Sequence, residues 1–301
     1  MSNLSVIGPV LLGLALSQVT GSSQTPAFVQ QNYAVPQTAK STVSVAYPAA
    51  QVGGNANIVV VGWNDTFASI ASVSDSAGNQ YLLAVPAFPA EGMSQAIYYA
   101  ADIHQGANTV SVSFNQPAAF VDLRITEYSG LITHGDLFEA GTSAAGDSPN
   151  ADSGPVSVSS TNDLILGAGI TATAFTAPST GFNLRVITSP NGDIVEDQVV
   201  SNPGLYHGLA TVNSGAWLMQ VAAFRAAAQP SGPQLNSQLT STNSLLITWP
   251  AAETGFTLQA SAQLGTSNWT NLTNAVGVVA GQYQVIVPLS GPQTFFRLKS
   301  P

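Results

Sequence analysis

Short segments in which apolar and polar residues alternate fill the chain from about Thr42 onward. A period of two places successive side chains on opposite faces of an extended chain, and it indicates half-buried β-strands. Clusters of Gly, Pro, Asn, Asp and Ser separate the segments, as turn residues do. The segments predicted to be strands before residue 226 are 42–47, 57–63, 80–85, 94–101, 109–114, 120–128, 156–159, 163–173, 184–188, 194–200, 207–212 and 216–225.

This density of strands predicts an all-β fold. About a dozen strands within roughly 200 residues fit two sheets around one core, in a large β-sandwich of jelly-roll type. A stretch rich in Ala, Pro and Gly at 226–233 has the composition of a linker. Beyond it, shorter strands are expected at 245–249, 256–260, 269–272, 283–287 and 295–298. The expected domains are an apolar N-terminal arm or donor strand (1–35), a jelly-roll-like β-sandwich (36–228), a linker (229–234) and a small β-sandwich (235–301).

Charged residues are rare. They make up 7% of the 301 residues, against about 25% in an average soluble protein. With 15 acidic and 6 basic residues the formal charge is −9, and no basic stripe is present, so we expect no nucleic-acid partner. The absence of cysteine excludes disulfide scaffolds and thiolate metal sites. The hydrophobic share of 45% is enough for a core and argues against disorder.

The N-terminus carries an apolar, uncharged run at 4–19, interrupted by Gly8, Pro9 and Gly13. It is short for a membrane-spanning helix, which needs about 20 apolar residues, so no span is expected in the mature protein. Three interpretations stay open: an arm that adds a strand to a neighbouring subunit, a secretory signal peptide, or a strand of its own domain. On the first interpretation the inter-subunit contact is made by Leu4, Val6, Ile7, Val10, Leu11, Leu12, Leu14 and Leu16.

Two parts of the chain resemble known modules. The stretches IVVVGWND, SVSDSAGNQY, SQAIYYAADI, NTVSVSF, VDLRITEYSGL and AWLMQVAAFR resemble lectin-like, jelly-roll β-sandwich domains of secreted bacterial surface proteins. The run LLITWPA, followed by GFTLQAS, NWTNL, QYQVIVPL and FFRLKS, resembles a small fibronectin type III-like or immunoglobulin-like domain, in which Trp249 would be the buried tryptophan of the second strand. The resemblance implies export to the cell surface or medium and an adhesion or assembly role, and it brings no catalytic residues.

Familiar catalytic arrangements are missing. The sequence has no G-x-S-x-G motif, and its three histidines occupy separate segments without a metal-binding spacing. On the strand at 120–128, Asp122 and Arg124 share one face and Glu127 lies on the other, so the two acids do not form a glycosidase pair. Glu127 is expected to pair with Arg124 or Arg225 as a structural ion pair. We therefore expect no enzymatic activity.

Two kinds of modification or ligand site are suggested by short motifs. The segment 139–154, expected to be a loop, carries oxygen ligands suited to calcium at Asp147, Asn150 and Asp152. Ordinary turn chemistry also explains these residues, and no other cofactor is expected. N-x-[ST] sequons that an exporting host could glycosylate occur at Asn3, Asn64, Asn268 and Asn271.

The scarcity of charge is the main functional indication. A polar but uncharged surface is less costly to bury than a charged one, because an unpaired charge loses its hydration. Together with tandem β-domains and an apolar arm, this predicts an extracellular or cell-surface structural protein whose partners are copies of itself, joined by a donated strand. The alternative is a module that binds polysaccharide, with sugar rings stacked on aromatic side chains such as Trp63 or Tyr206.

Overall fold

Strands joined by tight turns build the whole described part of the chain. The computed structural model describes residues 25–228 and, further on, 233, 235–242, 244–252, 254–263, 268–288 and 294–299. Within these residues the regular elements are β-strands in antiparallel sheets, and no α-helix occurs, so the all-β prediction is confirmed. The chain divides near residue 229 into two units. We call residues 25–228 the block and the described residues from 233 onward the C-terminal unit.

The first half of the block contains eight strands in two sheets. They are β1 (Ala27–Ala34), β2 (Lys40–Ala46), β3 (Ala56–Trp63), β4 (Ile70–Asp75), β5 (Leu82–Ala90), β6 (Met93–Ala100), β7 (Thr109–Ala118) and β8 (Asp122–Ser129). One sheet has the order β1-β8-β3-β6-β5 and the other the order β2-β7-β4.

The second half repeats this arrangement. Its strands are β9 (Phe138–Gly146), β10 (Asn150–Val158), β11 (Asp163–Thr171), β12 (Phe175–Pro178), β13 (Asn183–Ile187), β14 (Ile194–Val200), β15 (Gly204–Val212) and β16 (Trp217–Phe224). The sheet orders are β9-β16-β11-β14-β13 and β10-β15-β12, which are the orders of the first half with every strand number raised by eight. The block is therefore an internal duplication of one eight-stranded unit.

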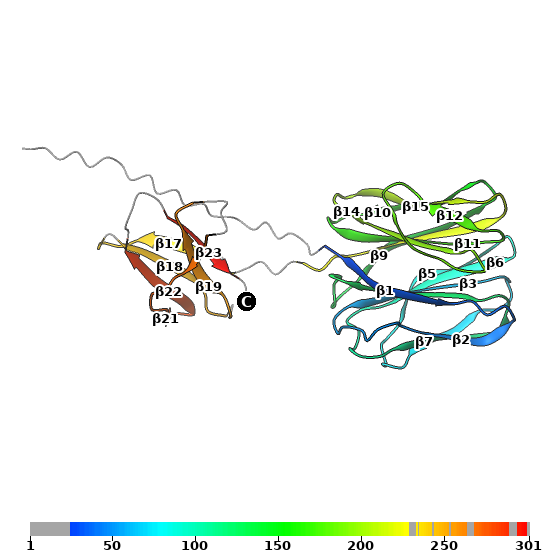
Figure 1. Cartoon of the computed structure of the whole chain (residues 1–301), viewed down its shortest axis with the longest axis horizontal. Coiled ribbons are helices and arrows are strands. Elements are labelled where there is room, and N and C mark those ends of the chain that lie inside the picture. The colour runs from blue at the N-terminus through cyan, green and yellow to red at the C-terminus, as the bar shows by residue number, and fades with distance from the viewer. Residues whose placement is uncertain are drawn as a thin grey trace, which may run out of the picture. The chain divides into compact units, whose positions relative to one another are not determined.

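The four sheets stack as layers, with the two five-stranded sheets in the middle and a three-stranded sheet outside each of them (Figure 1). Ile58 and Val60 of β3 face the central core, which the second half completes from β11, β14 and β16. Val59, Val61 and Trp63 face the outer sheet of the first half. A strand buried on both faces reads as a continuous apolar run, which explains the sequence of β3.

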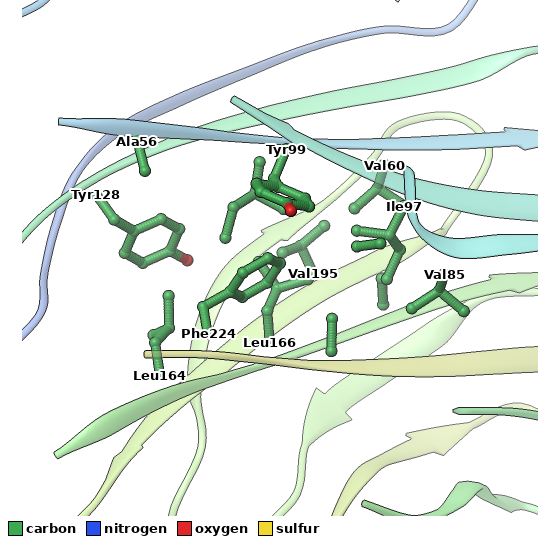
Figure 2. Packing of buried hydrophobic residues seen from close by; sticks show 14 of the residues in the cluster. Ala56, Val60, Val85, Ile97, Tyr99, Tyr128, Leu164, Leu166, Val195 and Phe224 are labelled. Carbon is green, nitrogen blue, oxygen red and sulfur yellow. The ribbon is translucent and has the colours of Figure 1, made fainter. Parts of the chain in front are cut away.

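Apolar side chains from the two middle sheets meet in the central core. Figure 2 shows Tyr99 of β6 and Tyr128 of β8 on one side, and Leu164, Leu166 and Phe224 on the other. The rings of Tyr99 and Phe224 pack edge to face with centroids 5.7 Å apart. Aromatic pairs of this geometry contribute beyond their buried area.

A buried ion pair on β8 lies between the middle sheets, and hydrogen bonds from its arginine join them. Arg124 Nε lies 2.9 Å from Asp122 Oδ1, and the two side chains are 1% and 0% exposed. Arg124 Nη1 donates to the carbonyl oxygens of Gly169 and Ile194 in the second half, at 2.9 and 2.7 Å. Burial of the guanidinium is tolerated because its hydrogen-bond donors meet acceptors on both sheets.

Further polar side chains extend this contact. Thr188 Oγ1 donates to Asp122 Oδ2 at 2.6 Å, and Arg124 Nη2 donates to Gln95 Oε1 at 2.7 Å. Gln220 of β16 in turn donates to the Gln95 carbonyl oxygen at 3.0 Å. We call these residues, together with Asp193, the cross-sheet polar cluster: Gln95, Asp122, Arg124, Thr188, Asp193 and Gln220.

Several strands were not predicted. Residues 27–34, expected in the N-terminal arm, form β1 and pair with β8 from Ala27 opposite Ser129 to Ala34 opposite Leu123. This edge strand is rich in amides and lacks clear alternation, so its sequence hides it. Within the block the prediction also missed β4, β9 and β12, and β10 begins at Asn150 rather than at residue 156; beyond it, β17 (Asn236–Leu239) and β21 (Gly277–Val279) were missed. Residues 1–24, with the expected inter-subunit contacts, lie outside the described part of the chain.

The C-terminal unit is a smaller set of antiparallel sheets. Its strands are β17 (Asn236–Leu239), β18 (Ser244–Pro250), β19 (Thr257–Ser261), β20 (Thr270–Asn271), β21 (Gly277–Val279), β22 (Gln282–Pro288) and β23 (Phe295–Lys299). They form the orders β17-β18-β22-β21 and β20-β19-β23. Trp249 is buried with Ile247, Leu258 and Val285.

The cross-sheet polar cluster generates a stability prediction. Arg124→Met leaves Asp122 buried beside Asp193 without its cation, and breaking a buried pair in this way costs about 3–5 kcal/mol. We expect urea unfolding to show a loss of this size. Lys40→Met, on an exposed basic residue, is the control, with a change within about 0.5 kcal/mol. An unchanged urea midpoint for Arg124→Met would contradict the assigned role.

Candidate functional site

Several ionisable side chains of the block are buried, and their partners explain them structurally. Glu127 of β8 accepts hydrogen bonds from Gln30 Nε2 and Asn55 Nδ2, both at 2.6 Å, and from the Val52 backbone N–H at 3.2 Å. Three donors thus satisfy the carboxylate at the end of the block where β8 finishes. Glu127 joins the edge strand β1 to the loop between β2 and β3.

The expected pairing of Glu127 with an arginine is wrong. Arg124 forms its ion pair with Asp122, which lies on the same face of β8. Arg225 lies 3.8 Å from Asp136 and 3.9 Å from Glu139, and its Nη1 donates to the Asp136 carbonyl oxygen at 2.8 Å. Alternation places Glu127 on the opposite face from Arg124, as the sequence indicated, and amides replace the expected cation.

Asp75 organises the turn after β4. Its carboxylate accepts hydrogen bonds from Asn108 Nδ2 at 2.7 Å, Asn79 Nδ2 at 2.8 Å and the Tyr81 hydroxyl at 2.9 Å. Burial opposes ionisation of Asp75, but the hydrogen bonds from Asn108 and Asn79 outweigh it and lower its pKa. The turn at 75–79 is therefore a hydrogen-bonded structural element.

Three buried acids have raised pKa values because the block contains few cations to pair with them. Burial raises the pKa of Glu196 to about 8. Its Oε1 accepts the Leu209 N–H at 3.0 Å, while Oε2 has no partner within the described residues. Burial, with Glu139 nearby, raises the pKa of Asp163 to about 6. Burial and the neighbouring Asp122 raise the pKa of Asp193.

The residues proposed for calcium do not lie in a long loop. Strand β9 ends at Gly146 in a middle sheet and β10 begins at Asn150 in an outer sheet, so most of the segment 139–154 is strand, with Asp147 exposed in the short connection between the two sheets. Asp152 Oδ1 accepts the Gly154 N–H at 2.8 Å and lies 2.7 Å from His207 Nδ1. Within the described residues no group of three or more His, Asp or Glu could hold a metal ion. The calcium site stays a prediction.

Three of the four sequons can be placed. Asn64 is exposed in the loop between β3 and β4, and Asn268 and Asn271 are exposed in the C-terminal unit. Asn271 Oδ1 also accepts a hydrogen bond from Gln259 Nε2 at 2.8 Å. Asn3 lies outside the described residues. Glycosylation stays a prediction.

The aromatic residues considered for sugar stacking are not the exposed ones. Trp63 is 1% exposed and lies in the core. Tyr206 is half-buried, and its hydroxyl donates to the Asn202 carbonyl oxygen at 2.7 Å. Sequence reasoning missed the exposed aromatics, Phe67 at 82% and Phe120 at 45%. The available signal was Asp65, a turn-forming residue two positions before Phe67, which indicates that Phe67 lies in a loop.

One carboxylate holds the two loops that carry these phenylalanines. Asp65 Oδ1 accepts the backbone N–H groups of Phe67 and Ala68 at 3.0 and 2.8 Å, and its Oδ2 accepts the Ala119 N–H at 2.9 Å. The Asn64 N–H also donates to the Ala119 carbonyl oxygen at 2.8 Å. We call residues 64–69 and 119–121 the distal tip.

The distal tip lies at one end of the strands, and the chain enters and leaves the block at the other. Phe120 comes just before β8, whereas Gly130 follows it. A Cβ built on Gly130 would lie 2.9 Å from the Thr25 carbonyl oxygen, and the Ala227 N–H donates to the Gly130 carbonyl oxygen at 2.8 Å. The eight residues of β8 separate the two ends by roughly 25 Å.

The outer sheet of the first half presents hydroxyl groups to solvent. Alternation turns Val43, Val45 and Val112 into the core and leaves Ser and Thr outside. Ser44 and Ser111 lie in register with hydroxyls 2.8 Å apart. We call this surface the hydroxyl face: Thr42, Ser44, Ser72, Ser74, Thr109, Ser111 and Ser113.

Glu196 generates a pH prediction. The folded block holds its proton up to about pH 8, whereas the ordinary pKa is 4.5. Between these values the folded state binds more protons than the unfolded state, so stability falls as the pH rises. We expect the melting temperature to fall between pH 5 and pH 9, and Glu196→Gln to reduce that fall. The control is Asp147→Asn, at an exposed carboxylate, which should leave the fall in melting temperature unchanged. If Glu196→Gln and the wild type lost the same melting temperature between pH 5 and pH 9, the raised pKa of Glu196 would be contradicted.

The described residues include no helix with the length and hydropathy that a membrane crossing requires. No protein-family model matches the chain, and a comparison with curated proteins finds no match either.

Proposed function

We propose that this protein is an extracellular structural subunit that assembles with copies of itself, joined through its apolar N-terminal segment. The observation that carries the proposal is the hydroxyl face, where Ser and Thr side chains of three neighbouring strands lie together and the exposed Lys40 stands at the end of β2. Hydroxyl groups both donate and accept hydrogen bonds, so such a surface is complementary to another copy of itself. Burying it requires no charge to lose its hydration.

The ionisable groups support a structural role rather than catalysis. Glu127, Asp75 and Asp122 are all satisfied within the block, and their donors come from separate strands or loops. A general acid or base must reach the reacting group of a substrate, and these carboxylates are directed at neighbouring amide, hydroxyl, guanidinium and backbone groups of the block. The protein is therefore proposed to be non-enzymatic.

We also infer the finer classification of the sandwiches from strand order. Each half of the block pairs its first strand with its eighth and its third with its sixth, as in β1 with β8 and β3 with β6. Eight strands with these long-range pairings suit a jelly roll built from Greek keys. In the C-terminal unit, the order β17-β18-β22-β21 opposite β19 and β23 suits an immunoglobulin-like or fibronectin type III-like domain. Both folds recur in exported proteins that act as spacers or adhesins.

Carbohydrate binding, the alternative function, has less support. The two aromatic residues considered for sugar stacking make contacts within the fold: Trp63 packs in the core, and the Tyr206 hydroxyl donates to the Asn202 carbonyl oxygen. A stacking platform needs an open aromatic face. In the block the exposed aromatic rings are those of Phe67 and Phe120 in the distal tip.

Deletion of residues 1–24 tests the proposed function. We expect the truncated protein to remain folded, because β1 begins at Ala27 and the cores lie beyond it. It should no longer form the polymers of the full chain, as measured by electron microscopy and light scattering.

The control is the native protein itself, whose mass and N-terminal sequence establish whether residues 4–19 are present in the mature form. Polymers that contain the segment and disappear on its deletion support the proposal. A full-length protein that stays monomeric would overturn it, as would a mature form that assembles after losing the segment as a signal peptide.

A further inference from the structure

We propose that the distal tip of one copy receives the apolar N-terminal segment, residues 4–19, of the next copy. The inference rests on the proposed self-assembly and names the surface that accepts the segment. Phe67 is the most exposed of the large hydrophobic side chains that the structure places on the surface, at 82%. Phe120 is also exposed, and Asp65 ties its loop to the loop of Phe67, so the tip carries two exposed rings; grouped apolar side chains of this kind mark interaction sites.

The distal tip is held in shape before any partner arrives. The three hydrogen bonds that Asp65 accepts, from Phe67, Ala68 and Ala119, tie its two loops together. Ser94 Oγ adds a bond to the Asp65 carbonyl oxygen at 2.8 Å. A preorganised surface loses little conformational entropy on binding, so the phenylalanines can act as fixed anchors.

The backbone of Phe120 is strained in a way that suits this role. Its φ is +45°, in the left-handed region that bulky L-residues rarely adopt. Such strain persists where the surrounding structure enforces it, and it concentrates at functional sites. Here the enforcing contacts are the two hydrogen bonds on Ala119, to Asn64 and Asp65. A glycine would serve the turn without strain, so the presence of phenylalanine indicates a use for its ring.

Charge favours the N-terminal segment as the occupant. The run at 4–19 contains no Asp, Glu, Lys or Arg. In the distal tip the only such residue is Asp65, and backbone N–H groups occupy both of its carboxylate oxygens. An uncharged apolar segment can therefore cover the phenylalanines without burying an unpaired charge.

Position favours a neighbouring copy over the same one. The chain enters the block beside Gly130, roughly 25 Å of β-strand away from Phe120. The 24 residues before Thr25 reach about 80 Å when extended, enough to cross to another block. A donor at one end and an acceptor at the other end form a heterologous contact, which yields an open filament when the rotation between successive copies does not close a ring.

Disulfide mapping tests the contact, because the chain has no cysteine of its own. Phe67→Cys is combined in the full chain with Val10→Cys, Leu12→Cys or Leu14→Cys, and assemblies are oxidised. We expect a ladder of covalent multimers on a non-reducing gel that collapses on reduction, with single variants forming dimers at most. The matched control replaces Phe67→Cys by Val52→Cys, at an apolar side chain 60% exposed that lies beside Glu127 at the opposite end.

A ladder specific to Phe67→Cys supports the inference. Disulfides that form within monomers, or a ladder of equal yield with Val52→Cys, would overturn it. A second variant, Phe67→Ser with Phe120→Gly, removes both rings and relieves the strained backbone, so it should fold. We expect it to raise the concentration needed for assembly at least tenfold.

These outcomes separate the inference from the proposed function. If the wild type assembles, loses assembly on deletion of residues 1–24, and yet assembles normally with Phe67→Ser and Phe120→Gly, only the inference fails. If the wild type is monomeric and a neutral-glycan array shows binding that depends on Phe67, both proposals fail and the tip is a carbohydrate site.

Discussion

The packing of two five-stranded sheets against each other is the interaction on which the block depends. Each outer sheet covers only one side of a middle sheet, so the other side must find a partner to leave water. The central core supplies it, with Tyr99 and Phe224 in edge contact and Leu166 and Val60 beside them. The cross-sheet polar cluster fixes one arrangement of these faces, because Arg124 must meet the carbonyl oxygens of Gly169 and Ile194.

Scarcity of cations shapes the rest of the interior. With 6 basic residues for 15 acidic ones, most buried acids cannot form ion pairs. Some are satisfied as anions by amides, as Glu127 is by Gln30 and Asn55. Others have raised pKa values, as Glu196 and Asp163 do. The interior therefore favours the protonated state of Glu196 and Asp163, and the stability that these two groups contribute falls as the pH rises through their pKa values.

The sequence predicted the strand-rich fold but not the duplication. Continuous or alternating apolar runs identified β3, β6, β11 and β16, where burial selects the side chains. The edge strands β1 and β9 were missed, since each pairs along one side only and carries amides or small residues. The repeat stayed hidden because equivalent strands use different residues: β8 reads DLRITEYS and the corresponding β16 reads WLMQVAAF. The distal tip could not be predicted, since the exposure of Phe67 depends on hydrogen bonds from a loop more than 50 residues away.

The duplication has an evolutionary consequence. All hydrogen-bonded pairs of the block's named strands lie within one half or the other. Backbone pairing therefore defines each half, and side chains define how the halves fit together. Substitutions on the facing surfaces can alter that fit gradually without unpairing a strand. A single ancestral half could first have met a second copy across this surface, and fusion of the two genes would then have let each face diverge to suit the other.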